Sequence, residues 1–231
     1  MAILNLLSGG AAAGLVEAVR AAFAQQTGLD MQGDFGAVGL MKDKLLAGAA
    51  CDVLILTEAL VGQLVASGHA VAGSARPLGL VKTGIAVKNA VAMPDVSNPQ
   101  ALKAALLAAN GIYFPDPVKA TAGIHFFKVL QQLGIDAQVA SRLRPFANGA
   151  TAMREMANCA EAGLIGCTQK TEILHAPGVD WVASLPVEFE LATVYTAAVS
   201  NTAANPKAAQ TLVAMLTGPQ GASQRRAAGF E

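Results

Sequence analysis

The sequence carries little charge and has none of the long hydrophobic runs of a membrane protein. Only 14% of its 231 residues are charged, and 16 basic residues balance 16 acidic ones. No run of Lys or Arg forms a basic patch, so nucleic acid is not an expected partner. No segment approaches ~18 uninterrupted apolar residues, so no membrane-spanning helix is expected. The 53% hydrophobic content instead predicts a folded chain with a sizeable core.

Cysteine is scarce and forms no familiar pattern. Cys51, Cys159 and Cys167 are an odd number at spacings that match no zinc site. We expect all three to be reduced, small core residues. We expect neither a metal nor a cofactor.

Signatures of several enzyme classes are missing as well. The sequence has no G-x-x-x-x-G-K-[ST] phosphate loop, no G-x-G-x-x-G after a strand, no H-E-x-x-H and no G-x-S-x-G. The three histidines, His69, His125 and His175, are far apart in the chain. The sequence therefore argues against the enzyme classes that depend on such motifs.

The first residues do not resemble a secretory signal. The apolar stretch 2–7 is short, has no basic residue before it, and leads directly into Ser8-Gly9-Gly10. We interpret it as the first strand of the fold. The sequence as written is expected to be cytoplasmic, or periplasmic if a signal sequence has been removed.

Predicted strands and helices alternate along the chain, which indicates an α/β fold with parallel sheets. The clearest example is 112–133. Here Ile112-Tyr113-Phe114 is a short β-forming run, two prolines interrupt it, and Phe126, Val129 and Leu133 then follow the spacing of one helix face.

Four times, a predicted strand leads through a turn of small residues into a helix. The turns are Ser8-Gly9-Gly10, Ala37-Val38-Gly39, Thr121-Ala122-Gly123 and Asn148-Gly149-Ala150. A helix start presents unpaired N–H groups and a partial positive charge. Small side chains let an anion approach these groups, so the turns predict a cluster of anion-binding donors. The alternative for Gly123 is that it only permits close packing of helix on sheet.

The order of these motifs resembles the periplasmic molybdate-binding proteins, the receptors of ABC importers. The resembling segments are Ser8-Gly9-Gly10, 39–53, 116–123, 165–171 and 208–230. The resemblance covers nearly the whole chain. It implies a type 2 periplasmic-binding-protein fold, with two α/β lobes, each a mainly parallel sheet flanked by helices, and a ligand cleft between them.

The resemblance also implies lobe boundaries and ligand-binding residues. Lobe I is expected to comprise 1–82 and 194–231, and lobe II 83–193. The strands predicted at 80–87 and 191–200 would cross between them. The expected ligand-binding residues are Ser8, Gly9, Gly10, Val38, Gly39, Thr83, Ala122, Gly123, Asn148, Gly149 and Gln169.

Two departures from the family pattern bear on the ligand. The second loop of the family usually offers a serine hydroxyl, but Ala37-Val38-Gly39 has none, and Gln169 replaces a ligand tyrosine. A tetrahedral oxyanion would lose two side-chain donors, each worth ~1–3 kcal/mol if buried partners go unsatisfied. We therefore expect a small organic carboxylate to bind better than molybdate or sulfate, since the amide of Gln169 both donates and accepts.

Two functions stay open. The first is binding of a small oxyanion or carboxylate, with an ABC permease as partner if the chain is a transport receptor. The second is isomerisation of an unsaturated tricarboxylate by proton abstraction and return, because 166–173 and 185–190 resemble the subgroup that includes aconitate isomerase. His125, just inside a predicted helix, is the candidate acid or base. Glu172 is either a base or a helix cap, and Lys82 is a candidate partner for a carboxylate.

Overall fold

The computed structural model describes residues 3–231; Met1 and Ala2, the first residues of the predicted lobe I, lie outside that range. The chain forms two compact units. The first contains the described residues up to Val81 together with Thr193–Glu231, and the second is Lys82–Ala192. Strand β4 (Arg76–Lys88) contributes to both units, because the division falls within it.

The sheet of the first unit has the strand order β2-β1-β3-β9-β4. Strand β1 (Ile3–Gly9) is parallel to β2 (Asp30–Gly36) and β3 (Val53–Thr57), whereas β9 (Ala192–Val199) is antiparallel to β3. The connections β1 to β2 and β2 to β3 run in opposite directions along the sheet. Because such crossovers are right-handed, their helices lie on opposite faces.

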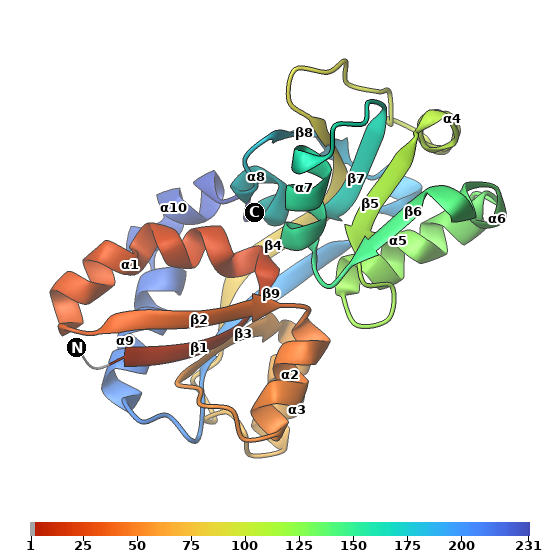
Figure 1. Ribbon diagram of the computed structural model, residues 1–231. Helices are drawn as coiled ribbons and strands as arrows, with labels where there is room; N and C mark the ends of the chain where they lie inside the picture. Colours follow the sequence, from red (N-terminus) through yellow and green to blue (C-terminus); the bar gives the residue numbers. More distant parts are fainter. Residues whose placement is uncertain (1–2) are drawn as a thin grey trace. The chain divides into compact units, whose positions relative to one another are not determined.

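Helices therefore cover both faces of this sheet. Figure 1 shows α1 (Ala13–Thr27) on one side and α2 (Val38–Leu46) with α3 (Glu58–Ala66) on the other. Helix α9 (Pro206–Thr217) and the short α10 (Ala222–Ala227) contact α1.

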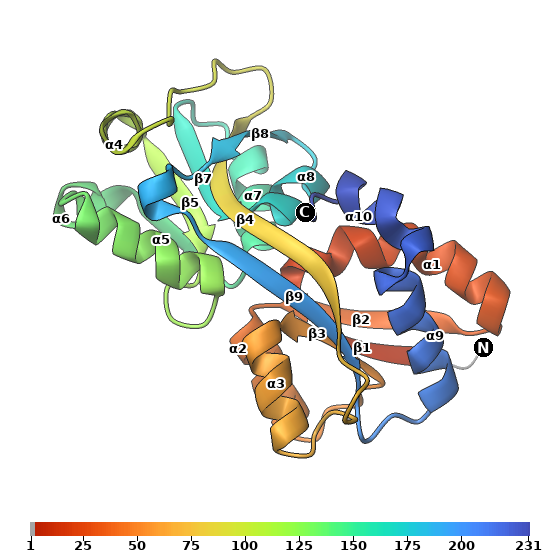
Figure 2. The ribbon, with the colours of Figure 1, turned by 180° about the vertical axis from the view of Figure 1, so that it is seen from behind.

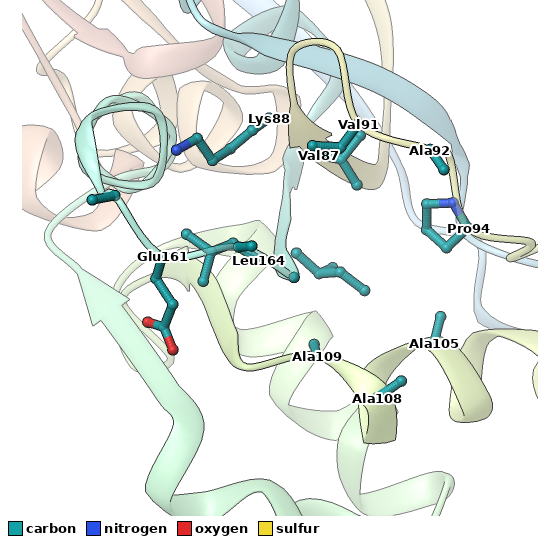
Figure 3. A pocket seen from close by; sticks show the side chains of 14 residues that line it. Val87, Lys88, Val91, Ala92, Pro94, Ala105, Ala108, Ala109, Glu161 and Leu164 are labelled. Atoms are coloured by element: carbon teal, nitrogen blue, oxygen red, sulfur yellow. The ribbon is translucent and has the colours of Figure 1, made fainter.

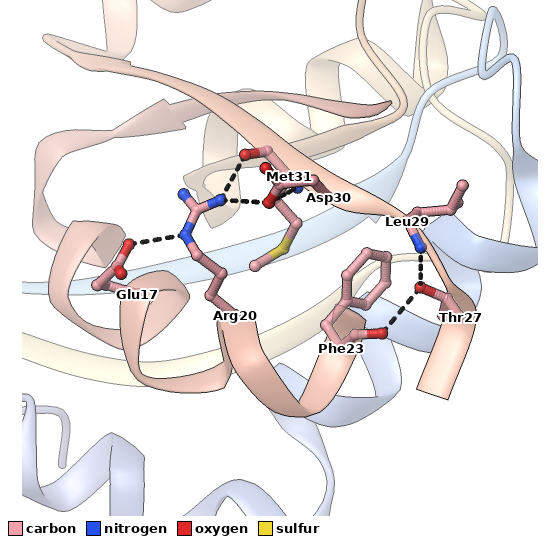
Figure 4. A network of polar contacts seen from close by, with 7 residues as sticks. All are labelled: Glu17, Arg20, Phe23, Thr27, Leu29, Asp30 and Met31. Carbon is pink, nitrogen blue, oxygen red and sulfur yellow. Dashed lines mark hydrogen bonds and ion pairs between the residues drawn. The ribbon is translucent and has the colours of Figure 1, made fainter. Parts of the chain in front are cut away.

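A polar network joins helix α1 to strand β2 (Figure 4). The guanidinium of Arg20 donates to the carboxylates of Glu17 and Asp30, at 2.9 and 2.8 Å, and to the carbonyl of Met31 at 2.6 Å. The hydroxyl of Thr27 donates to the carbonyl of Phe23 at 2.8 Å. These contacts are partly exposed, so we assign them a modest stabilising role and no role in ligand binding.

The sheet of the second unit has the order β4-β7-β5-β6, and β8 (Val179–Ser184) also pairs with β4. Strand β5 (Gly111–Pro115) is parallel to β6 (Leu143–Phe146) and β7 (Leu164–Gln169), while β4 is antiparallel to β7 and β8. Helices α5 (Thr121–Gln132) and α6 (Asp136–Val139) lie before the sheet in Figure 2. Helix α4 (Pro99–Ala108) shares the core of this face, since its Leu102 and Leu106 cluster with Phe126 of α5. Helices α7 (Gly149–Asn158) and α8 (Lys170–His175) lie before it in Figure 1.

Side chains of β5 alternate between these two faces, as the period of a strand requires. Phe114 contacts Phe126 of α5, with ring centroids 5.5 Å apart, whereas Tyr113 belongs to the core formed with Met153 and Met156 of α7. The strand, loop and helix predicted for 112–133 are confirmed.

Several short elements were not predicted from the sequence. Strand β6 forms because it pairs with β5, with Leu143 opposite Ile112, and helix α10 has only six residues. Short elements depend on tertiary contacts more than on local propensity. Turns of 3-10 helix complete the fold at Gly10–Ala12, Ala140–Arg142, Val187–Phe189 and Pro219–Gly221. Within residues 3–231, no helix is both long and apolar enough to cross a membrane.

Candidate functional site

Apart from Thr83, which lies within the antiparallel strand β4, the predicted ligand-binding residues lie at or after the carboxyl ends of parallel strands. In the first unit β1 ends at Gly9 and β2 at Gly36, just before α2. In the second unit β5, β6 and β7 end at Pro115, Phe146 and Gln169. The carboxyl ends of parallel strands share one edge of a sheet, and ligands of open α/β sheets bind at that edge.

Gly9 brings the end of β1 close to the start of α2 in the first unit. A Cβ at Gly9 would lie 2.9 Å from Cγ1 of Val38 and 2.9 Å from Cε1 of Tyr195, so a larger residue would force these side chains to shift. Ser8 is fully buried, and its hydroxyl donates to the carbonyl of Gly9 at 2.9 Å. The structure thus groups Ser8, Gly9 and Val38 and adds Tyr195, which the sequence analysis missed because β9 comes from the far end of the chain.

Helix α2 begins without a side-chain cap. Its N-cap residue is Ala37, whose methyl side chain makes no capping hydrogen bond. The first turn, with Val38 and Gly39, also has no acidic residue. Its N–H groups keep the partial positive charge of a helix start. Gly10, by contrast, begins the 3-10 turn Gly10–Ala12, and a full helix starts only at Ala13.

Helix α5 of the second unit also begins without a side-chain cap. Its N-cap residue is Ala120, and Ala122 and Gly123 lie in the first turn. A Cβ at Gly123 would lie 2.2 Å from the carbonyl oxygen of Pro115 and 2.3 Å from that of Asp116. The packing explanation for Gly123 therefore has direct support, and it is compatible with open N–H groups in the same turn.

Gln169 and Thr83 face the α5 side of the second sheet. Strand alternation places Gln169 on the same face as Cys167, which belongs to the core under α5. Thr83 lies opposite Gln169 in the strand pair, and its hydroxyl donates to Oε1 of Gln169 at 3.5 Å. Gln169 is only 2% exposed, yet its Nε2 has no hydrogen-bond partner within the described residues. An unpaired buried donor costs ~1–3 kcal/mol, so this amide is the clearest candidate for contacting a ligand.

The start of helix α7 differs, because an internal carboxylate occupies it. Glu172 of α8 is buried, and its carboxylate accepts hydrogen bonds from the backbone N–H groups of Gly149, Ala150 and Gln169. The hydroxyl of Thr168 donates to Oε2 of Glu172 at 2.5 Å. Burial raises the pKa of Glu172, although these donors act in the opposite direction.

These contacts give the predicted residues Asn148 and Gly149 internal partners. Oδ1 of Asn148 accepts from the N–H of Thr151 at 2.8 Å, which makes Asn148 the N-cap of α7. A Cβ at Gly149 would lie 2.0 Å from Oε2 of Glu172. Glu172 was expected to cap the helix after it or to act as a base. It lies within α8 instead and reaches across to α7.

His125 and Lys82 also have partners within the second unit. Nε2 of His125 lies 2.7 Å from the carbonyl oxygen of Phe189, and because a carbonyl only accepts, Nε2 carries the hydrogen. This bond joins α5 to the 3-10 turn Val187–Phe189. Nζ of Lys82 lies 2.8 Å from a carboxylate oxygen of Glu190.

An apolar pocket of about 340 Å³ lies elsewhere in the second unit (Figure 3) and includes none of the predicted residues. Its two charged groups already have partners. The ammonium of Lys88 donates to the carbonyl of Cys159, and Glu161 pairs with Arg144 at 2.9 Å. Because the remaining lining is mainly Ala, Val, Leu and Ile, the pocket does not suit a small anion.

Comparison with known proteins identifies relatives over the whole chain. An aconitate isomerase from Pseudomonas sp. is 26% identical over 239 residues, which covers 99% of this chain and 87% of the relative. The periplasmic molybdate-binding protein of Azotobacter vinelandii superposes with a TM-score of 0.79 at 22% identity, covering 99% of this chain and 98% of that one. The sulfate-binding protein SubI of Mycobacterium tuberculosis gives a TM-score of 0.75 at 17% identity, covering 100% and 86%.

These likenesses confirm the predicted fold class, the type 2 periplasmic-binding-protein fold. The sequence model of the family described as bacterial extracellular solute-binding protein matches residues 4–231. Members of this family are periplasmic or extracellular, the second of the two locations considered from the sequence. The chain therefore belongs to the bacterial extracellular solute-binding proteins.

Proposed function

We propose that the chain binds a small organic carboxylate and acts as the solute-binding component of an ABC importer, with an ABC permease as its partner. The observation that carries this proposal is the buried amide of Gln169, whose Nε2 has no partner within residues 3–231. The uncapped starts of α2 and α5 support it, because both offer N–H groups to an anion.

The choice of a carboxylate over a tetrahedral oxyanion follows from the donors available. The first turn of α2 has Val38 and Gly39 but no hydroxyl. Gln169 supplies a planar amide that can donate to a carboxylate oxygen and accept from a hydroxyl or a protonated acid. From the sequence we predict that the N–H groups at the start of α2 and the amide of Gln169 contact the same ligand.

Calorimetric titration tests this proposal. We expect at least one carboxylate from a series of mono-, di- and tricarboxylates, trans-aconitate among them, to bind more tightly than molybdate or sulfate. A Gln169→Leu variant should lose most of that affinity, because it removes the amide. Micromolar binding of molybdate together with no binding of any carboxylate would refute the proposal.

A second candidate function is isomerisation of an unsaturated tricarboxylate. The observation that favours it is the 26% identity to a protein named aconitate isomerase over nearly the whole chain. His125 is the candidate acid or base for moving the proton. Following the ultraviolet absorbance of trans-aconitate with wild type and a His125→Ala variant tests it. Turnover that the variant loses supports the isomerase, and no turnover by wild type excludes it.

A further inference from the structure

At the carboxyl end of strand β7, the hydrogen-bond donors on its two faces differ in whether they have an acceptor. Gln169 faces the α5 side, where a buried N–H donor has no partner among the described residues. Thr168, the residue before it, faces the α7 side and donates to Glu172. One face thus lacks an acceptor, and the other already has one.

The α7 side is built as a complete anion site. The carboxylate of Glu172 accepts from two N–H groups of the α7 start, from the N–H of Gln169 and from the Thr168 hydroxyl. The side chain of Glu172 is 7% exposed, and the 2.0 Å separation between Oε2 and a Cβ built at Gly149 leaves no room for another atom between them. No second anion can take these donors while Glu172 holds them.

We propose that Glu172 is a specificity-determining residue, which fills the anion position at the start of α7 and selects for ligands with a single negative charge. This inference rests on the proposed function and deepens it, because it names monocarboxylates as the ligand class. The carboxylate of Glu172 accepts from the backbone N–H of Gln169, so a ligand held by the side-chain amide of the same residue would lie near a group that is negatively charged above its raised pKa. At such separations each additional ligand charge is repelled through a medium of low effective dielectric constant.

A matched pair of ligands isolates the charge. Butyrate and succinate have the same number of carbon atoms and differ by one carboxylate. We expect wild type to bind butyrate more tightly than succinate in calorimetric titration. A Glu172→Gln variant should narrow that preference by roughly tenfold, since the amide keeps the shape and removes the charge. Glu155→Gln, which removes one half-buried carboxylate that pairs with Arg154 on α7 itself, should leave the preference unchanged.

Chemical rescue tests whether the Glu172 carboxylate occupies an anion site at the start of α7, and it needs no assumption about the ligand. A Glu172→Ala variant exposes the donors of the α7 start in a hole that has the size of a carboxylate. Formate should raise the melting temperature of this variant in a saturable way, beyond the effect of sodium chloride at equal ionic strength. Wild type should show no such rise.

The outcomes distinguish the selectivity assigned to Glu172 from the proposed function of the chain. If ligands bind but Glu172→Gln keeps the wild-type ratio within twofold, or if wild type prefers succinate, the selectivity is overturned and the proposed function stands. If no carboxylate or oxyanion binds wild type or Glu172→Gln, both fail. The absence of a saturable formate effect on Glu172→Ala overturns the assignment of an anion site at the α7 start.

Discussion

The hydroxyl of Thr168 donates to the carboxylate of Glu172 at 2.5 Å, at the junction of strand β7 and helix α8. The same carboxylate accepts from the N–H groups of Gly149 and Ala150 at the start of α7. A single side chain therefore ties three segments of the second unit together. It also satisfies a helix start that, from its small residues, was expected to serve a ligand.

The burial of Glu172 predicts a pH-dependent contribution to stability. Its folded-state pKa is raised above the ordinary value of 4.5, mainly by desolvation. This contribution is therefore fully present below the unfolded-state pKa and is lost as the pH rises through the folded-state pKa. We expect the unfolding free energy of wild type, minus that of Glu172→Gln, to decrease as the pH is raised from about 4 to about 8. Urea unfolding across that range measures it.

Glu155→Gln is the control for loss of one carboxylate, because Glu155 lies on α7 with its side chain 42% exposed and, within residues 3–231, forms an ion pair only with its neighbour Arg154. The raised pKa would be contradicted if the unfolding free energy of wild type minus that of Glu172→Gln increased with rising pH while the same difference for Glu155→Gln did not.

Replacing Gln169 should separate stability from binding. Gln169→Met removes an amide whose Nε2 has no partner within residues 3–231 and whose Oε1 has only the 3.5 Å contact with Thr83. The free protein should be as stable as wild type, or more stable by up to ~1–3 kcal/mol, because a buried unpaired donor is gone. Carboxylate affinity should fall about tenfold or more, since a hydrogen bond to a charged group is lost. Thermal unfolding and calorimetry measure the two effects. A loss of stability with unchanged affinity would show that Gln169 is structural.

Gly123 should not tolerate a methyl group. In Gly123→Ala the new Cβ would meet the carbonyl oxygens of Pro115 and Asp116 at 2.2 and 2.3 Å, and backbone atoms cannot move aside cheaply. We expect a loss of about 1–3 kcal/mol in urea unfolding. Gly62→Ala is the matched control, because Gly62 lies inside helix α3 with nothing within 4 Å of its Cβ position. This control should gain about 0.5–1 kcal/mol. Equal effects at both sites would refute the packing role of Gly123.

The three cysteines should differ in reactivity. A hydrogen bond from the hydroxyl of Tyr113 lowers the pKa of Cys159, whereas burial raises the pKa of Cys51 to about 12 and that of Cys167 well above its usual range. Because the thiolate is the reactive form, iodoacetamide should modify Cys159 first in the folded protein, as peptide mass spectrometry would show. Tyr113→Phe should slow this reaction while the protein stays folded. Preferential labelling of Cys51 or Cys167 would contradict the assignment.

The sequence by itself was sufficient for the fold class and for most elements around the site. Strand β5, which ends at the first of two prolines, and helix α5 were predictable from the sequence. Their signals are β-forming residues, prolines and the apolar spacing of one helix face, and all of these signals are local. The start of α7 is equally local, because Asn148 caps its own helix through the N–H of Thr151. Strand β6 was missed since its stability comes from pairing with β5.

Only the tertiary structure decided which helix starts remain open. Small residues mark α2, α5 and α7 alike, but the donors of α7 are taken by Glu172, which another element carries to them. The unpaired Nε2 of Gln169 and the contact of Tyr195 with Gly9 are likewise invisible in the sequence. The physical reason is that a local pattern specifies where a donor or acceptor lies along the chain. Whether a partner reaches it depends on how distant segments pack.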